Sequence, residues 1–166
     1  MMEKKYVMAI DQGTTGTRVI LFNRKGEIHA SAYHEIQQIY PHPGWVEHNP
    51  IEYWDTVMKS AHQVLQEGNA RAEEIDSIGI TNQRETTTLW DRYTGEPYHN
   101  AIVWQCRRTA SICQELRSAG HNELFREKTG LLLDPYFSGT KIRWALENIP
   151  EVQEAAKRGT LACGTI

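Results

Sequence analysis

A run of glycine, threonine, aspartate and arginine near the N-terminus has the composition of an anion-binding turn. The run extends from Asp11 to Arg18 and lies between two short apolar segments. Both segments are rich in β-branched and aromatic residues, so they predict buried strands joined by a hairpin. Gly13 and Gly16 predict a turn that uses positive φ angles and lets a ligand approach the main chain. The turn amides could then form a concave nest for an anion.

The side chains of this run point to nucleotide phosphates. The hydroxyls of Thr14, Thr15 and Thr17 are donors, and the guanidinium of Arg18 has a fork of donors suited to phosphate. Asp11 would repel an anion unless a metal ion lay between them, and Mg²⁺ is commonly held by one carboxylate together with phosphates. The run lacks the Gly-Lys-Ser/Thr ending of a Walker A loop. The alternative is a polar turn without a ligand, since these are ordinary turn residues.

A second group of polar residues follows later predicted strands. Arg84 and Glu85 are neighbours of opposite charge that could grip adjacent hydroxyl groups of a polyol. Trp104 could cover the carbon side of a small polyol, and Tyr136 offers a hydroxyl on an aromatic body. Each has a structural alternative: an exposed ion pair, a core tryptophan and a surface tyrosine. Arg107 and Arg108 could pair with acids or remain solvated.

Hydrophobic periodicity and turn residues predict the elements that position these side chains. Strands over about 5–12, 17–23 and 28–36 form an antiparallel meander with the glycine-rich turn at its first bend. Asn49 and Pro50 start a helix that runs to about Glu67, with Trp54 in its apolar stripe and in the core. Further strands are expected at 75–81, 86–90, 101–104 and 161–166, and helices at 109–119, 122–128, 139–148 and up to 158. This order predicts an α/β fold with a mixed sheet and helices packed on it.

Composition excludes several classes of protein. The chain has 166 residues, the length of one domain, and a formal net charge of -3, so a basic footprint for nucleic acid is absent. No apolar run reaches the length of a membrane span. The three cysteines lack metal-ligand spacing and predict reduced thiols in a cytoplasmic protein. The apolar C-terminal residues 161–166 suggest that the chain is the first part of a longer protein.

Five stretches together resemble the FGGY carbohydrate kinase family. They are Asp11-Gln12-Gly13-Thr14-Thr15 with Arg18, Pro43-Gly44-Trp45-Val46-Glu47-His48, Gly79-Ile80-Thr81-Asn82-Gln83-Arg84-Glu85-Thr86, Asn100-Ala101-Ile102-Val103-Trp104-Gln105-Cys106-Arg107-Arg108-Thr109, and Asp134-Pro135-Tyr136-Phe137-Ser138-Gly139-Thr140-Lys141. A single stretch would indicate only the wider actin-like ATPase superfamily. The third and fourth stretches together point to the glycerol-phosphorylating members of the family.

The resemblance implies an activity and a set of site residues. It implies that residues 1–166 form an actin-like, ribonuclease-H-like N-terminal domain that uses ATP to convert glycerol to sn-glycerol 3-phosphate. Thr14, Thr15 and Gly16 would meet the ATP phosphates, Arg18 the ADP side, and Asp11 would serve Mg²⁺. The glycerol hydroxyls would be held by Arg84, Glu85 and Tyr136, and its carbon face by Trp104. Many members have Ser-Ser where this chain has Gly16-Thr17, so a side-chain contact to phosphate is lost at residue 16.

The resemblance also implies what lies outside this chain. In the family, the aspartate that acts as the base and the nucleotide-binding lobe follow beyond Ile166, so the isolated fragment would be inactive. Dimers or tetramers and control by sugar-transport phosphocarrier proteins are further implications. Three alternatives remain: another sugar kinase of the family, a non-catalytic actin-like nucleotide-binding module such as a chaperone ATPase, and a structural fragment with a vestigial site.

Overall fold

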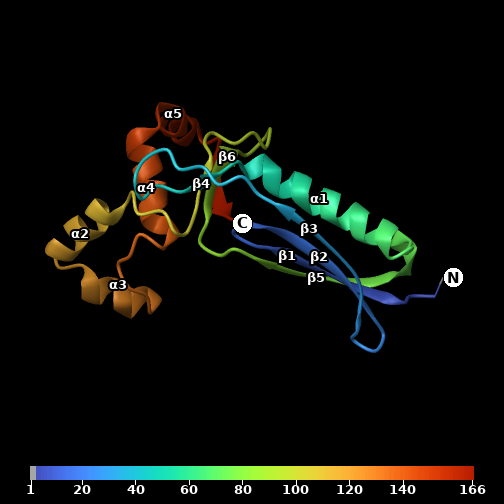
Figure 1. Ribbon diagram of the computed structural model, residues 1–166. Coiled ribbons are helices and arrows are strands. Elements are labelled where there is room, and N and C mark those ends of the chain that lie inside the picture. The colour runs from blue at the N-terminus through green and yellow to red at the C-terminus, as the bar shows by residue number, and fades with distance from the viewer. Residues whose placement is uncertain (1–2) are drawn as a thin grey trace. The chain divides into compact units, whose positions relative to one another are not determined.

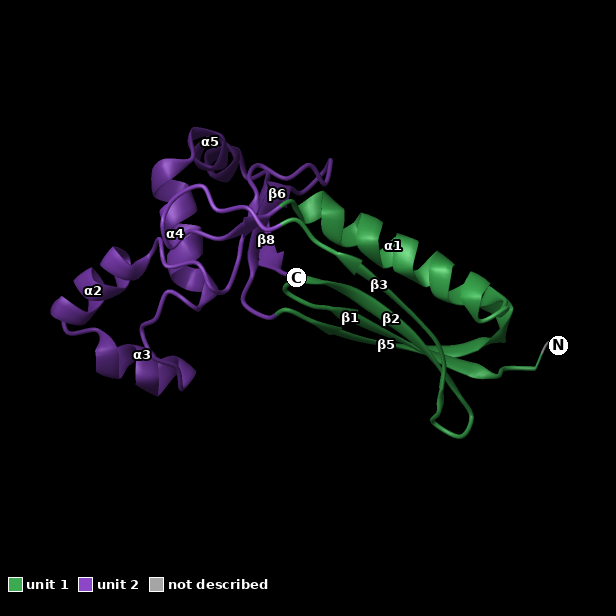
Figure 2. Ribbon diagram, in the orientation of Figure 1, with its two compact units in different colours: residues 1–37, 49–83 green, residues 38–48, 84–166 purple. Residues whose placement is uncertain are grey.

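The computed structural model describes residues 3–166, which form two compact units (Figure 1). The first unit contains the chain up to residue 37 and residues 49–83. The second contains residues 38–48 and 84–166, as the two colours in Figure 2 show. The chain therefore passes between the units at three places, and each unit is built from separate stretches of sequence.

The first unit is a four-stranded mixed sheet in the order β3-β2-β1-β5. Strands β1 (Tyr6–Gln12), β2 (Gly16–Asn23) and β3 (Ile28–Glu35) are successive antiparallel neighbours, which confirms the predicted meander. Strand β5 (Ile75–Asn82) pairs parallel with β1, after a short 3-10 turn, η1 (Ala72–Glu74). The glycine-rich run thus joins two central strands of this sheet.

Helix α1 (Pro50–Glu67) covers one face of this sheet (Figure 1). The Asn49 side chain accepts a hydrogen bond from the Ile51 amide, and Pro50 occupies the first turn, so the predicted cap is confirmed. The core beneath the helix is apolar and consists of Met8, Ile10, Val19, Leu21, Ala32 and Val64.

The prediction that Trp54 belongs to the core is wrong. Its side chain is 66% exposed, whereas Tyr53, Thr56, Ser60 and Val64 form the buried stripe of α1. The rest of the predicted stripe is confirmed in part, because Val64 is buried and Val57, Ala61 and Leu65 pack against the core. The buried face also includes the polar Thr56 and Ser60, so periodicity weighted by hydrophobicity misplaces the edge of the stripe at Trp54.

The second unit contains another four-stranded sheet, in the order β4-β7-β6-β8. Its strands are β4 (Glu47–His48), β6 (Thr87–Asp91), β7 (Ala101–Ile102) and β8 (Leu161–Thr165), and all its pairings are antiparallel. The expectation of one mixed sheet is therefore incomplete. The predicted strands at 86–90, 101–104 and 161–166 correspond to β6, β7 and β8, whereas β4 was not predicted because its two residues are too few to carry a detectable alternation of apolar and polar side chains.

Four helices complete the second unit. They are α2 (Ala110–Ser118), α3 (Asn122–Thr129), α4 (Ser138–Asn148) and α5 (Pro150–Arg158), each close to its predicted range. Leu89 of β6 packs with Ala145 of α4 and Val152 of α5 in one core cluster. Within residues 3–166 the three cysteines are free thiols, and no helix is both long and apolar enough to cross a membrane.

Candidate functional site

The β1–β2 turn is tight and leaves no room for a side chain at residue 16. The Gly13 amide donates to the Gly16 carbonyl at 3.0 Å. A Cβ atom on Gly16 would lie 2.5 Å from the His34 carbonyl oxygen and 2.5 Å from the Tyr33 hydroxyl. Neither glycine of the turn has a positive φ, so that expectation is wrong. Gly16 is required here by close approach of β3 to β2, not by an unusual backbone angle.

Strand alternation decides which side chains of the turn face solvent. Thr17 points into the first unit, where its buried hydroxyl bonds Gln12 Oε1 at 2.9 Å and Thr56 Oγ1 at 2.7 Å. The expectation that Thr17 offers a donor to an anion is therefore wrong. Asp11 and Arg18 are directly opposed across β1 and β2, and both are exposed. They lie on the outer face of the sheet, away from the helix.

The remaining turn side chains are accessible. Thr15 is exposed, and its hydroxyl lies 3.4 Å from the Tyr33 hydroxyl. The Arg18 guanidinium lies 5.3 Å from the centre of the Tyr33 ring, a cation–π distance. Thr14 is half-buried at the tip of the turn. Thr14, Thr15 and Arg18 thus remain on one accessible turn of the first unit, next to the exposed carboxylate of Asp11.

The donor set suits a magnesium ion that is bound mainly by a nucleotide. Residues 3–166 contain no group of three histidine, cysteine, aspartate or glutamate side chains that could hold a metal by themselves. Asp11 offers one exposed carboxylate at the end of β1. A single carboxylate supplemented by phosphate oxygens and water is the usual protein contribution to a Mg²⁺ site.

Gln83 anchors the end of the sheet beneath this turn. Its amide donates to the Gln12 carbonyl at 2.7 Å, and its side-chain amide donates to the Gly13 carbonyl at 3.2 Å. Gln83 is buried, although it lies in a run of polar residues directly before Arg84. Residue 83 therefore holds the glycine-rich turn in place, whereas Arg84 begins the second unit.

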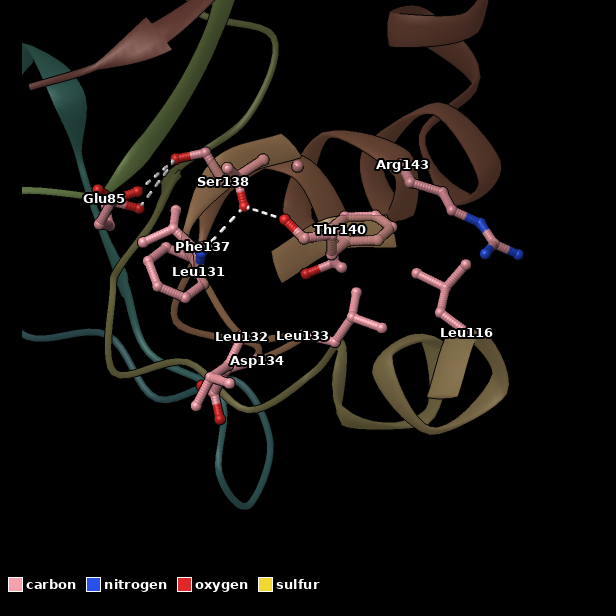
Figure 3. Close-up of a pocket in the computed structure, with 13 residues that line it drawn as sticks. Glu85, Leu116, Leu131, Leu132, Leu133, Asp134, Phe137, Ser138, Thr140 and Arg143 are labelled. Atoms are coloured by element: carbon pink, nitrogen blue, oxygen red, sulfur yellow. Dashed lines mark hydrogen bonds between the residues drawn. The ribbon is translucent and has the colours of Figure 1, made fainter. Parts of the chain in front are cut away.

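Glu85, in the second unit, has a strained backbone and a crowded carbonyl group. Its φ angle is 65°, in the left-handed region that non-glycine residues seldom adopt. The carbonyl oxygen accepts hydrogen bonds from Lys141 Nζ at 2.8 Å and Thr87 Oγ1 at 3.3 Å. The Ser138 hydroxyl lies 3.4 Å from the Glu85 carboxylate, and Figure 3 shows these two side chains together. Such strain is concentrated at functional sites.

The aromatic residues predicted to hold a polyol are neighbours. The rings of Trp104 and Tyr136 meet edge to face with centres 5.8 Å apart, and Tyr136 packs against Phe137 at 5.0 Å. Trp104 follows β7, and its amide donates to the Thr86 hydroxyl at 3.2 Å. Both Trp104 and Tyr136 are half-buried, and Trp104 also packs against the core cluster that contains Ile102 and Val103. The structure therefore brings Glu85, Trp104 and Tyr136 together within one unit, with the exposed Arg84 adjoining Glu85.

Lys141 connects two parts of this cluster and was not singled out from the sequence. Its side chain is fully buried, and its ammonium group donates to the carbonyl oxygens of Glu85 and Tyr136 at 2.8 and 2.5 Å. Burial lowers the pKa of Lys141 to about 8. A lysine on a predicted helix normally indicates an exposed face. Its place next to the Tyr136 loop was the only sequence signal.

Arg108 is a second buried cation, and it has a structural role. Its guanidinium contacts the rings of both Trp45 and Trp144, 4.0 and 4.5 Å from their centres, and donates to the Glu47 carboxylate at 2.6 Å. The prediction left open whether the two arginines pair with acids. Arg108 forms this buried pair, whereas the exposed Arg107 contacts Asp134 at 3.3 Å.

A cavity of about 550 Å³ lies next to the cluster of Glu85, Trp104 and Tyr136, and Glu85 forms part of its lining. Its lining is mostly apolar and includes Leu116, Phe125, Leu132 and Phe137, with Glu85 as one of its few charged residues (Figure 3). An apolar lining does not suit the hydroxyl groups of a small polyol. The polar atoms of Arg84, Glu85 and Tyr136 are the better match for such a ligand.

Comparison with known proteins identifies the family. The family model described as the N-terminal domain of the FGGY family of carbohydrate kinases matches residues 6–165. The chain belongs to the FGGY family of carbohydrate kinases. This FGGY chain is 57% identical over 165 residues to glycerol kinase of Symbiobacterium thermophilum, covering 99% of this chain and 33% of that protein. It spans about a third of the length of the curated relatives it matches.

Solved structures agree with the family and the fold. Plasmodium falciparum glycerol kinase with ADP superimposes with a TM-score of 0.83 at 34% identity, covering 99% of this chain and 33% of that one. Ligand-bound xylulose kinase from Lactobacillus acidophilus gives a TM-score of 0.82 at 25% identity, covering 90% of this chain and 30% of that one. The FGGY chain therefore has the actin-like, ribonuclease-H-like α/β fold of these kinases.

Proposed function

We propose that this chain is the N-terminal part of an ATP-dependent kinase that phosphorylates glycerol to sn-glycerol 3-phosphate in the cytoplasm. The observation that carries the proposal is the grouping of Glu85, Trp104 and Tyr136, which combines hydroxyl-binding groups with an aromatic face. The relatives named glycerol kinase, 57 and 56% identical to this chain, favour glycerol among polyols.

The hydrogen-bonding groups and the aromatic face of these side chains suggest a role for each residue. Arg84 and Glu85 would bind adjacent hydroxyls by donating to one and accepting from another, while Tyr136 would bind a further hydroxyl and Trp104 would cover the carbon atoms. These contacts would orient the attacking hydroxyl for in-line transfer.

The nucleotide would bind at the turn of the first unit. Thr14, Thr15 and the Gly16 amide would contact its phosphates, and Arg18 would lie on the ADP side. Asp11 would hold Mg²⁺, which shields the negative charge of the phosphates when bound. The base and the second lobe would come from later parts of a longer chain, so we expect the 1–166 fragment to release no ADP in a glycerol-dependent manner.

Titration calorimetry of the full-length protein with glycerol tests the substrate site. The wild type is compared with Arg84→Ala and with Arg158→Ala, a control at an exposed arginine on α5. Loss of a charge-assisted hydrogen bond should weaken binding by roughly tenfold to a hundredfold in Arg84→Ala alone. Equal binding in all three proteins would place the substrate elsewhere.

A substrate panel separates glycerol from other sugars of the family. ATP-dependent ADP release is measured with glycerol and with xylulose, because a xylulose kinase has nearly the same fold similarity as a glycerol kinase. Release with xylulose and not with glycerol would contradict the proposal. Nucleotide binding without turnover of either would indicate a non-catalytic module.

Oligomer formation and regulation are proposed from the family resemblance alone. Light scattering of the full-length protein should give the mass of a dimer or tetramer. Control by a sugar-transport phosphocarrier protein would appear as an activity change when that phosphocarrier is added.

A further inference from the structure

Lys141 is the largest fully buried side chain of the described residues, although lysine is among the residues least often buried. It lies in the first turns of α4, and its ammonium group donates to two neutral carbonyl oxygens, those of Glu85 and Tyr136. Burial disfavours the charged form of Lys141, and the nearby carboxylates of Glu85 and Asp134 offset only part of that effect. A buried apolar side chain at this position would avoid that cost, so the ammonium group has a use that the core does not explain.

The two acceptors lie in segments that are far apart in the sequence. Glu85 precedes β6, and Tyr136 belongs to the loop before α4. Lys141 therefore joins these two segments through one atom, with hydrogen bonds of 2.8 and 2.5 Å. The side chains of both segments are those proposed to hold the substrate hydroxyls.

The Glu85 segment needs such a restraint. Its φ of 65° is unfavourable for a residue with a Cβ atom and persists only when surrounding contacts impose it. Besides Lys141, Thr87 and Ser138 donate to the same carbonyl oxygen, at 3.3 and 3.5 Å, but these are longer contacts between neutral groups. The ammonium group supplies the shortest and the only charged contact of the three.

We propose that Lys141 is a positioning residue that fixes the backbones of Glu85 and Tyr136 so that both side chains face one polyol ligand. The proposal rests on the proposed function, because it assigns Lys141 a role in binding the acceptor substrate. It predicts that the residue acts on the polyol and not on the nucleotide, since neither of its partners belongs to the glycine-rich turn.

Steady-state kinetics of the full-length enzyme test this role. Lys141→Met keeps an unbranched apolar side chain close to the length of the lysine stem and removes the ammonium group, and Lys128→Met on the exposed face of α3 is the matched control. Lys141→Met should raise the KM for glycerol by roughly tenfold or more, the effect of losing a charged hydrogen bond, with the KM for ATP unchanged. Lys128→Met should change neither constant.

A double-mutant cycle distinguishes positioning from a general loss of structure. If Lys141 acts through Glu85, the effects of Lys141→Met and Glu85→Gln on the glycerol KM should be less than additive. Additive effects, or an equal rise in both KM values, would overturn the proposal. If Lys141→Met does not fold, Lys141→Gln, which retains an amide donor, should fold and still raise the glycerol KM, and an unchanged KM would refute the role.

Turnover by the wild-type enzyme distinguishes failure of the positioning role from failure of the proposed function. Wild-type enzyme that turns over glycerol while the Lys141 variants keep a normal glycerol KM would contradict only the positioning role. Wild-type enzyme that does not phosphorylate glycerol would contradict the proposed function itself.

Discussion

Gly16 is a residue whose side-chain size is limited by close packing between β2 and β3. Any side chain at this position would collide with the His34 carbonyl and the Tyr33 ring. We predict that Gly16→Ser lowers the free energy of unfolding by about 1–3 kcal/mol, the usual cost of overpacking. Gly79→Ser is the control, because a Cβ on Gly79 of the same sheet meets no atom within 4 Å. Urea unfolding gives both values, and equal stability of the two variants would contradict this steric explanation.

His48 makes the second unit sensitive to acid. It is fully buried in β4, its Nε2 lies 2.9 Å from Gln38 Oε1, and burial lowers the pKa of His48 to about 4. The unfolded chain, with a pKa near 6.5, therefore binds more protons between pH 6.5 and 4, and stability must fall as pH decreases through that window. The contribution that is lost is at most about 3 kcal/mol.

Unfolding measured at pH 7 and at pH 4.5 tests this prediction. The wild type should lose more stability over this interval than His48→Gln, which cannot be protonated. Parallel pH profiles of the two proteins would show that other groups cause the acid sensitivity.

At the scale of secondary-structure elements, the sequence predicts those strands and helices that are long enough to show a periodic hydrophobic pattern. The meander, α1 and the order of the later helices are confirmed because each contains enough residues for a hydrophobic pattern. The predicted strands at 86–90, 101–104 and 161–166 are confirmed as β6, β7 and β8, but their grouping into a second sheet is not predicted. Strand β4 is missed because Glu47 and His48 look like loop residues until their neighbours are known. The site residues Glu85 and Tyr136 are suggested by residue type, whereas their connection through Lys141 depends on tertiary contact.

The buried ion pair of Glu47 in β4 and Arg108 predicts a large loss of unfolding free energy when one partner is removed. Glu47→Ala leaves the Arg108 guanidinium buried without its acid, which should lower the unfolding free energy by about 3–5 kcal/mol. Glu154→Ala is a matched control, because Glu154 and Lys157 form an exposed pair with the same N···O distance of 2.6 Å. Its loss should cost much less, because water and salt screen an exposed pair. Similar melting temperatures for the two variants would show that burial does not strengthen the Glu47 contact.

At the scale of the whole molecule, β5 indicates where a longer chain would pack. Ile78 and Ile80 are paired with Met8 and Ile10, so they share the face of the sheet that α1 covers. They are nevertheless 58 and 73% exposed, whereas Met8 and Ile10 are buried. Since the relatives are about three times as long as this chain, we propose that a later segment of the full-length protein covers these two side chains.

This packing predicts that one double variant lowers the stability of the full-length protein but not that of the 1–166 fragment. Burying an isoleucine contributes about 1.5–3 kcal/mol, so Ile78→Lys with Ile80→Lys should lower the stability of the full-length protein by about 3 kcal/mol or more. In the 1–166 fragment, the same change should leave the melting temperature almost unchanged and improve solubility, because the positions are already exposed. Ile28→Lys at the start of β3, where the side chain is 63% exposed, is the control in both contexts. A full-length protein that tolerates the double variant as well as the fragment does would mean that this face of β5 stays open and that the remaining lobe packs elsewhere.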